Sequence, residues 1–240
     1  MGEKRPLILC LQETKLPLCD ASLCSFLWGD SNHAFSYRSS VGASGGMLII
    51  LDSLEVEVWS TVSQDHMLLI HGRFIQSNEE FYVINIYSPC DGRAKQALWE
   101  ALSVRLQALR GEKICVCGDF NTVRCPEERR SLREGSNVND VQHFSMFIDD
   151  NDLVDLSLCG RRFTWFKGDG TSISRIDRFL LSEDWCLQWP NCIQVALLRG
   201  LSEHCPLQLS VDEENWGPRP VRMLKCWQDM AGYHQFVKDK

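Results

Sequence analysis

The sequence contains no pair of cysteines at the C-x-x-C spacing, although 12 of its 240 residues are cysteine. The usual spacing of a structural zinc site is therefore absent. Several cysteines lie inside apolar segments, as Cys115 and Cys117 do, and no secretory signal opens the chain. We therefore expect reduced, mostly buried thiols in an intracellular protein.

The sequence also lacks an excess of basic residues and any long apolar run. Its net charge of -7 indicates that it does not hold nucleic acid mainly by charge, although a bound cation can bring an acidic protein to a phosphate. No apolar run approaches the roughly 20 residues that span a bilayer, so we expect no membrane partner. The chain is 44% hydrophobic and 24% charged, which is typical of a globular protein. We expect one domain over residues 1–211 and a polar tail over 212–240 that ends in a loose helix.

The most informative stretch is 114–121, which reads Ile-Cys-Val-Cys-Gly-Asp-Phe-Asn. A short apolar run of this kind predicts a buried strand. Side chains alternate along extended backbone, so we expect Asp119 and Asn121 to point the same way and Phe120 to enter the core. An anion and an amide at the tip of a rigid strand suit water activation or metal binding beside a phosphate. The alternative is an ordinary strand end followed by an Asp/Asn turn.

Strand and helix patterns alternate along the rest of the chain, which predicts a layered α/β fold. Residues 94–109 form the clearest helix, because leucines recur at steps of four, four and three. Residues 19–35 show no clear period, and we expect residues 124–139 to be a solvated loop. Strands are predicted at 7–11, 47–51, 55–59, 67–75, 81–87, 163–166, 174–181, 195–198 and 207–209, with further helices over 141–150 and 182–185.

Polar groups suited to phosphate chemistry stand at five loop or strand-end sites. Each has an ordinary explanation: a surface carboxylate, a half-buried phenol, an ion pair of Asp177 with Arg175 or Arg178, or a histidine in a turn. Their recurrence at separate strand ends instead indicates one rim of a sheet, where ligands gather. The residues are Glu13, Tyr87, Asp119 with Asn121, Asp177, and Glu203 with His204.

The same residues carry a family resemblance that covers about residues 7 to 225. The chain resembles the endonuclease/exonuclease/phosphatase superfamily, and most of all the endonuclease domain of plant LINE-type (non-LTR) retrotransposons. The segments that resemble the superfamily, in order, are 12–15 (QETK), 85–89 (NIYSP), 118–121 (GDFN), 174–177 (SRID) and 202–206 (SEHCP); those that resemble the subgroup are 163–165 (FTW), 175–180 (RIDRFL) and 217–220 (GPRP).

The resemblance implies a four-layer α/β sandwich, with two mostly antiparallel sheets covered by helices. It implies divalent-metal-dependent hydrolysis of phosphodiesters in DNA. It also implies that the chain was once fused to a reverse transcriptase, and that it is a monomer located in the nucleus. Glu13 and Glu203 correspond to metal-binding carboxylates, and oxygen ligands suit Mg²⁺ or Mn²⁺.

The resemblance also implies a role for each remaining site residue. Asp119 would orient or deprotonate the attacking water, and Asn121 would hold the phosphate or the water. His204 would hydrogen-bond the scissile phosphate, with its ring steered by Asp177. Tyr87 would contact the phosphate or assist the leaving oxygen. A cation and fixed donors of this kind stabilise the charge that builds up during hydrolysis.

The chain departs from the family pattern at two places. A first strand ending in a metal-binding asparagine normally precedes the Gln-Glu-Thr strand, but only 12 residues precede Glu13. We therefore expect an N-terminally truncated frame that lacks this strand. Glu203 stands where the family has aspartate, which moves the carboxylate by about 1.5 Å, and a shift near 1 Å can cost about 10²-fold in rate.

Two alternatives remain open on the sequence. The departures favour a catalytically impaired remnant without nuclease activity. The fold would also suit a small phosphate ester, such as an inositol phosphate or sphingomyelin, but we find no basic pocket or membrane-facing loop for it.

Overall fold

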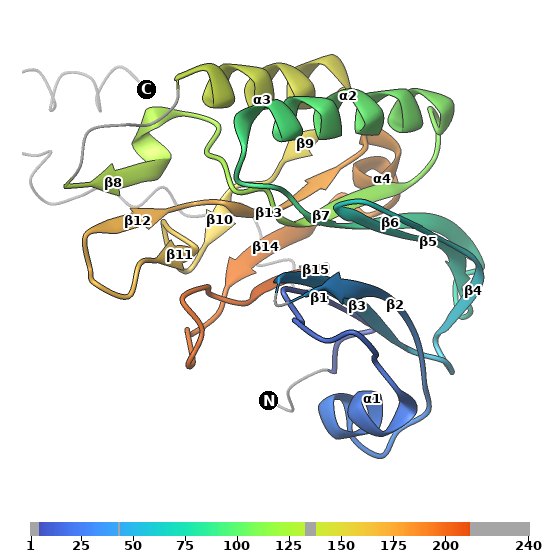
Figure 1. Cartoon of the computed structure of the whole chain (residues 1–240). Coiled ribbons are helices and arrows are strands. Elements are labelled where there is room, and N and C mark those ends of the chain that lie inside the picture. The colour runs from blue at the N-terminus through green and yellow to red at the C-terminus, as the bar shows by residue number, and fades with distance from the viewer. Residues whose placement is uncertain (1–4, 43, 133–137, 212–240) are drawn as a thin grey trace, which may run out of the picture.

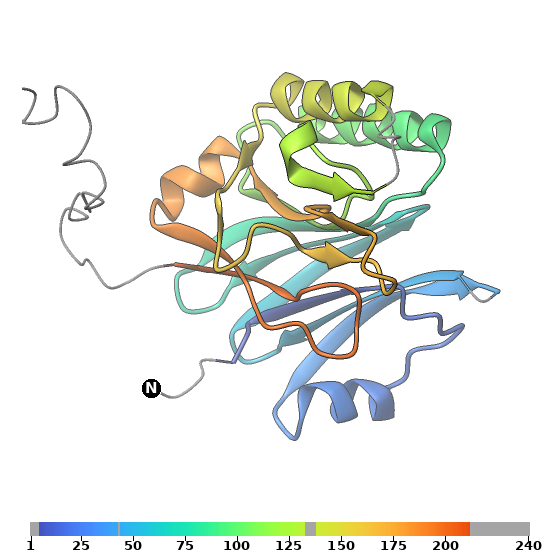
Figure 2. The same cartoon turned by 90° about the vertical axis from the view of Figure 1, so that its left-hand side faces the viewer.

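The computed structural model describes residues 5–42, 44–132 and 138–211, and these form four layers (Figure 1). Two helices cover one face of a large sheet, a smaller sheet packs on its other face, and another helix covers that smaller sheet (Figure 2). This arrangement confirms the predicted α/β sandwich of mostly antiparallel sheets. The predicted tail over 212–240 lies outside the described residues.

The large sheet has six strands in the order β4-β5-β6-β7-β13-β9. Strands β6 and β7 run parallel, because a helix connects them, and the other neighbours are antiparallel. The strands are β4 (Val56–Gln64), β5 (Met67–Phe74), β6 (Glu79–Tyr87), β7 (Ile114–Asp119), β9 (Val154–Asp155) and β13 (Asp177–Leu181).

Three smaller sheets complete the fold, in the orders β1-β3-β2, β11-β12-β8 and β10-β14-β15. Within the described residues, β1 pairs with β3 alone and is an edge strand. The strands are β1 (Ile8–Gln12), β2 (His33–Val41), β3 (Ser44–Asp52), β8 (Arg129–Ser131), β10 (Leu158–Cys159), β11 (Trp165–Phe166), β12 (Ser172–Ser174), β14 (Cys192–Ala196) and β15 (Leu207–Val211).

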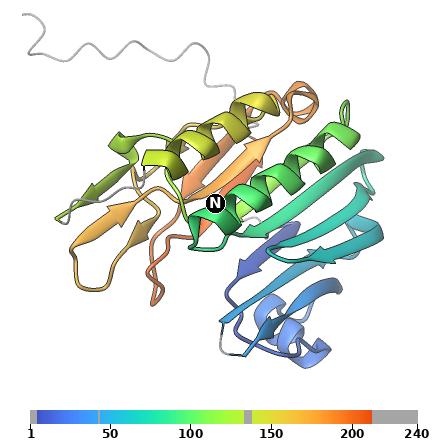
Figure 3. The ribbon, with the colours of Figure 1, turned by 45° about the horizontal axis from the view of Figure 1, so that its top comes forward.

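Helices α2 (Gly92–Ala108) and α3 (Val138–Asp150) lie side by side on the large sheet (Figure 3). The Asp91 side chain caps α2 by accepting a hydrogen bond from the Ala94 N–H at 2.9 Å. The predicted leucine stripe of this helix is buried against the sheet. Helix α4 (Glu183–Gln188) and a 3₁₀ turn, η1 (Pro126–Glu128), are short. Among the described residues, no helix combines the length and apolar character that a membrane span requires.

The core is divided among the layers. One cluster fills the space between α2, α3 and the large sheet, with Trp99, Phe120 and Phe144 at its centre. A second fills the space between the two main sheets and includes Cys115 and Cys117. The predicted burial of these cysteines is therefore confirmed.

Residues 19–35 contain helix α1 (Ala21–Trp28) and the start of β2, which the sequence pattern did not predict. Asp20 caps the helix, and Cys24 and Trp28 bury one face against the small sheet. Phe26 and Leu27 are exposed on the opposite face, so apolar residues surround the helix and hide its period.

Two other predictions were wrong in detail. The predicted strand over 174–181 is broken at Arg175 and Ile176, so that Ser174 ends β12 and Asp177 begins β13. Residues 133–137 of the expected solvated loop over 124–139 lie outside the described residues, and in the described part Glu128 is not solvated but reaches a buried ion-pair network. There it contacts Arg175 and Arg178, which also bind Asp155, and the Arg178 side chain is fully buried.

Candidate active site

Three of the predicted site residues form one row across the large sheet. Tyr87, at the end of β6, is the register partner of Asp119, at the end of the parallel strand β7. Asp119 is also the partner of Asp177, at the start of the antiparallel strand β13. Strand pairing alone therefore brings side chains from residues 87, 119 and 177 to one edge.

Gly118 makes this alignment possible. Its φ of +131° is a conformation that L side chains rarely adopt. A Cβ atom at this position would lie 2.0 Å from the Ile86 carbonyl oxygen on the neighbouring strand. Only glycine therefore lets β7 approach β6 closely enough to set Asp119 beside Tyr87.

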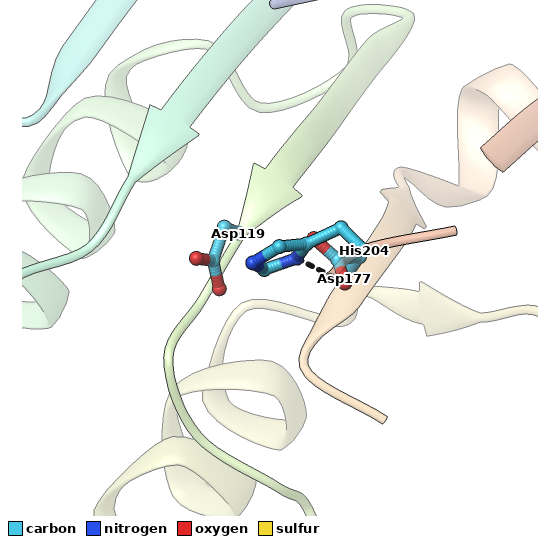
Figure 4. A group of neighbouring side chains, drawn as sticks. All are labelled: Asp119, Asp177 and His204. Carbon is cyan, nitrogen blue, oxygen red and sulfur yellow. Dashed lines mark hydrogen bonds and ion pairs between the residues drawn. The ribbon is translucent and has the colours of Figure 1, made fainter. Parts of the chain in front are cut away.

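The His204 ring lies between two carboxylates, those of Asp119 and Asp177 (Figure 4). Its Nδ1 is 3.0 Å from each carboxylate oxygen of Asp177. One ligand atom from each of these three residues lies within 4.8 Å of the others. Asp177 pairs with His204, rather than with Arg175 or Arg178.

Burial and the charges of the site together shift the pKa values of Asp119 and His204. Burial alone lowers the pKa of His204, but the hydrogen bond and charge of Asp177, with Asp119 and Glu13, raise it to about 8. Burial, then the charge of Asp177, raises the pKa of Asp119 to about 7. The ring is thus a hydrogen-bond donor near neutral pH, and Asp119 is a carboxylate that can accept a proton there.

Glu13 and Tyr87 form a second pair at the same edge. The Tyr87 hydroxyl donates a hydrogen bond to the Glu13 carboxylate, which follows β1. Burial, then this bond, raises the pKa of Tyr87 well above its usual range, so the phenol stays protonated. Glu13 has a φ of +52° and Lys15 a φ of +56°. Left-handed backbone at two non-glycine residues is strained, and such strain clusters at functional sites.

Asn121 reaches the site by a route that the alternation argument did not predict. Strand β7 ends at Asp119, and Asn121 has a φ of +48°, so the chain turns instead of continuing extended. Its backbone N–H donates to Asp119 Oδ1 at 2.8 Å, and its side-chain amide donates to the Ser88 carbonyl at 2.7 Å. Phe120 is fully buried, as predicted.

Glu203 lies outside the Asp119–Asp177–His204 group. Its side chain is exposed and accepts a hydrogen bond from the Gly168 N–H at 2.8 Å. Glu203, which is one methylene longer than the family's aspartate, therefore has its carboxylate held at the β11–β12 hairpin. The structure unites Glu13, Tyr87, Asp119, Asn121, Asp177 and His204, and does not bring Glu203 to them.

Two supporting residues escaped the sequence analysis. Lys95, buried on α2, donates to the Asn121 carbonyl at 2.8 Å and pairs with Asp140 at 3.1 Å. The available signal was its position: Lys95 lies three residues before Leu98, on the apolar side of the helix, where a charged side chain is unexpected. Thr164 is fully buried beside Asp177; it belongs to the segment 163–165 (FTW) that resembles the subgroup, but that resemblance gave it no role.

The donor set fits a divalent cation. Asp119, Asp177 and His204 each place a ligand atom within 4.8 Å of the others, and the charge of Glu13 adds to the raised pKa of Asp119. Crowded carboxylates of this kind are oxygen ligands for Mg²⁺ or Mn²⁺, and a cation would relieve their repulsion.

Comparisons with known proteins agree with this fold. The family model described as the Endonuclease/Exonuclease/phosphatase family matches residues 1–203. No curated protein sequence matches the chain. The fold places the chain in the two-sheet α/β sandwich class. The chain belongs to the Endonuclease/Exonuclease/phosphatase family, whose members are nucleases and phosphatases.

Solved structures with 14–16% identity share the fold. An AP endonuclease, LMAP, from Leishmania major has a TM-score of 0.67 and 14% identity, covering 86% of this chain and 78% of that one. A mannosyl-6-phosphatase from Bacteroides thetaiotaomicron has a TM-score of 0.56 and 14% identity, with coverage of 85% and 84%. Truncated Caenorhabditis elegans TDP2 has a TM-score of 0.52 and 16% identity, with coverage of 84% and 82%.

Proposed function

We propose that this protein is a DNA endonuclease that hydrolyses phosphodiester bonds with Mg²⁺ or Mn²⁺. The observation that carries the proposal is the His204 ring, held by Asp177 on one side and facing Asp119 on the other (Figure 4). The Glu13–Tyr87 pair at the adjoining strand end supports it.

His204 and Asp119 divide the proton chemistry. Asp177 occupies His204 Nδ1, so Nε2 is the nitrogen that donates to a phosphate oxygen. Asp119 accepts the proton of the attacking water, and its pKa of about 7 suits a general base near neutral pH. A divalent cation held by Glu13 would supply electrostatic stabilisation of the charge on the phosphate.

Tyr87 and Asn121 supply further donors. The raised pKa of Tyr87 keeps its hydroxyl protonated, and the proton, which is donated to Glu13 here, would serve the leaving oxygen once Glu13 held the cation. Asn121 donates one amide hydrogen to Ser88, which leaves its second amide hydrogen and its carbonyl oxygen for the phosphate or the water.

Arginines near the site favour a polynucleotide over a small phosphate ester. Arg162 and Arg199 belong to the two segments that run beside each other at Trp165 and His204. Their guanidinium groups lie over Phe163 and Phe166, 5.5 and 5.2 Å from the ring centroids. Each donates a hydrogen bond to a backbone carbonyl, Arg162 to Glu127 at 3.0 Å and Arg199 to Phe166 at 3.4 Å. The remaining N–H groups of each guanidinium can bind phosphates beyond the scissile one.

A plasmid-nicking assay tests the function. The wild-type protein with Mg²⁺ is expected to convert supercoiled DNA to the open circle, and EDTA to stop it. His204→Ala should remove the activity, whereas His33→Ala, a half-buried histidine on β2, should retain it. Activity that survives EDTA or His204→Ala would contradict the proposal.

A second assay tests the substrate class. The double variant Arg162→Ala/Arg199→Ala should raise KM for DNA while hydrolysis of bis(p-nitrophenyl) phosphate stays within about twofold. An equal loss on both substrates would argue against flanking-phosphate contacts.

The orientation of Glu203 favours a second candidate, a protein that binds nucleic acid without cutting it. The carboxylate of Glu203 is bound to Gly168 rather than turned toward the site. The absence of nicking by the wild type, with nicking restored in Glu203→Asp, would support this candidate.

We also infer an origin in a plant LINE-type retrotransposon. The support is the sequence of Phe163–Trp165 and of 175–180; the matching segment 217–220 lies outside the described residues. A reverse-transcriptase frame in the flanking genomic sequence would support this origin. A monomer that acts on nuclear DNA is the corresponding expectation.

A further inference from the structure

Thr164 links the two segments that carry the His204–Asp177 pair. It stands between the turn at residues 160–162 and strand β11, and its side chain is fully buried. It is therefore out of reach of substrate, and any part it has in the reaction acts through its neighbours.

The hydroxyl of Thr164 binds the segment that contains Asp177. Its Oγ1 accepts hydrogen bonds from the N–H groups of Ile176 and Asp177, both at 3.1 Å. A threonine hydroxyl has two acceptor lone pairs, so these two bonds use its full accepting capacity. The same oxygen lies 3.5 Å from the Ser174 carbonyl, the remaining partner for its proton.

These bonds occur where regular pairing is interrupted. Residues 175 and 176 separate strands β12 and β13, so the two N–H groups stand at the break that precedes Asp177. Buried backbone N–H groups need partners, and at this break a side chain provides them. The Ile176 carbonyl in turn accepts from the Phe120 N–H at 2.9 Å, which ties the break to the residue after Asp119.

The backbone of Thr164 binds the segment that contains His204. Its carbonyl accepts a hydrogen bond from the Cys205 N–H at 2.6 Å. The next residue, Trp165, is the bridge partner of His204, and the Phe166 N–H donates to the Glu203 carbonyl at 2.9 Å. One buried residue thus holds the residue after His204 through its carbonyl, and Asp177 through its hydroxyl.

We propose that Thr164 is a positioning residue that sets the distance and orientation between His204 and Asp177. Removing its hydroxyl leaves the Ile176 and Asp177 N–H groups without their acceptor, and the start of β13 shifts to find another. Because Nδ1 of His204 is held 3.0 Å from both Asp177 oxygens, a small shift of the Asp177 backbone changes the ring orientation. The catalytic part of this inference rests on the proposed nuclease function.

Two substitutions at Thr164 test the proposal kinetically. Thr164→Val keeps the shape and removes the hydroxyl, and Thr164→Ser keeps the hydroxyl. With valine we expect kcat for plasmid nicking to fall about 10-fold to 100-fold, as expected for a displacement near 1 Å, with KM within about twofold. Serine should restore kcat to within about threefold of wild type.

Ser172→Ala is the matched control. Ser172 is a buried residue of the adjoining strand β12, and its hydroxyl has no hydrogen-bond partner among the described residues. Its removal should leave kcat unchanged. Equal losses in Thr164→Val and Ser172→Ala, or a serine variant as slow as the valine variant, would overturn the proposal.

A spectroscopic measurement separates this inference from the nuclease function, because it needs no activity. The Nδ1 proton of a histidine bound to a carboxylate gives a downfield NMR signal, which we expect in the wild type and in Thr164→Ser. It should weaken or move upfield in Thr164→Val. An unchanged signal in a folded valine variant would contradict positioning, whatever the nicking assay shows.

A measurement on the wild type covers the case in which valine prevents folding. The amide protons of Ile176 and Asp177 should exchange slowly with solvent, at rates similar to the paired amides of β13. Fast exchange of both would show that Thr164 does not hold this segment, and the proposal would fail.

Discussion

Asp119 stands directly opposite Asp177 across the antiparallel pair of β7 and β13. Both carboxylates are buried, and the His204 ring lies between them. Two like charges this close raise the pKa of one, and the positive charge of His204 offsets part of that effect. The protonation of His204 and of Asp119 is therefore linked through Asp177.

The first prediction concerns Asp177→Asn. The change removes the charge that holds His204 protonated, so the pKa of His204 should fall from about 8 toward lower pH. The alkaline limit of activity should move the same way, and the rate should fall by about 10²-fold. A pH–rate profile of nicking measures both effects. Asp169→Asn, at the exposed β11–β12 turn, is the control; an unchanged profile for Asp177→Asn would reject the role of the pair.

The second prediction concerns Glu13→Gln and the dependence on metal. Because the amide is neutral, the Mg²⁺ concentration for half-maximal activity should rise about 10-fold or more. Titrating Mg²⁺ in the nicking assay measures this. Glu100→Gln, on the exposed side of α2, should behave as wild type. If Glu13→Gln instead lowered the rate at all Mg²⁺ concentrations without changing the midpoint, Glu13 would not be a metal ligand.

The layered fold was predictable because its longest elements have strong local patterns. The leucine stripe of α2 and the apolar run of β7 depend only on neighbouring residues, and both were placed within two residues of their true ends. Helix α1 was missed because its exposed side is also apolar, with Phe26 85% exposed. Periodicity fails when burial is decided by what the helix packs on rather than by its own sequence.

The meeting of the site residues at one edge was predictable from strand ends, but its supporting contacts were not. Asp119 and Asp177 follow or begin strands, so register brings them together. The network of Glu128 with Arg178 joins residues 50 positions apart, and its sequence reads as a solvated charge run. Glu203 shows the reverse: it adjoins His204 in sequence, yet its carboxylate is bound at Gly168.

The third prediction concerns acid stability. Burial alone would raise the pKa of Glu128, but the hydrogen bond and charge of Arg178, with Arg124 and Arg175, lower it below 4.5. A carboxylate with a depressed pKa stabilises the fold above its unfolded pKa, and this contribution is lost as the pH falls through the folded value. Stability should therefore decline below about pH 4.5.

Glu128→Gln tests this. At pH 7 it should cost on the order of 3 kcal/mol in the free energy of unfolding, because it leaves buried arginines short of a charge partner. The difference from wild type should shrink as the pH falls below 4.5. Urea unfolding at several pH values measures it, and Glu127→Gln, an exposed neighbour, is the control. A difference that stays constant with pH would mean that Glu128 is not ionised in its network.

The fourth prediction compares two glycines that both have positive φ. Gly118 has a φ of +131° and faces the Ile86 backbone, whereas Gly111 has a φ of +89° and nothing within 4 Å of its missing Cβ. Gly111→Ala should cost only the backbone strain, about 1 kcal/mol. Gly118→Ala should cost about 4 kcal/mol or more, because backbone atoms cannot move aside.

Urea denaturation of both variants measures the difference between their losses in the free energy of unfolding. This difference separates the cost of the clash between β7 and β6 from the cost of positive φ. The approach also sets Asp119 beside Tyr87, so any folded Gly118→Ala protein should nick DNA more slowly, while Gly111→Ala should not. Equal destabilisation by the two substitutions would show that the contact with Ile86 does not constrain the strand. The alignment of the site would then have to come from β13 alone.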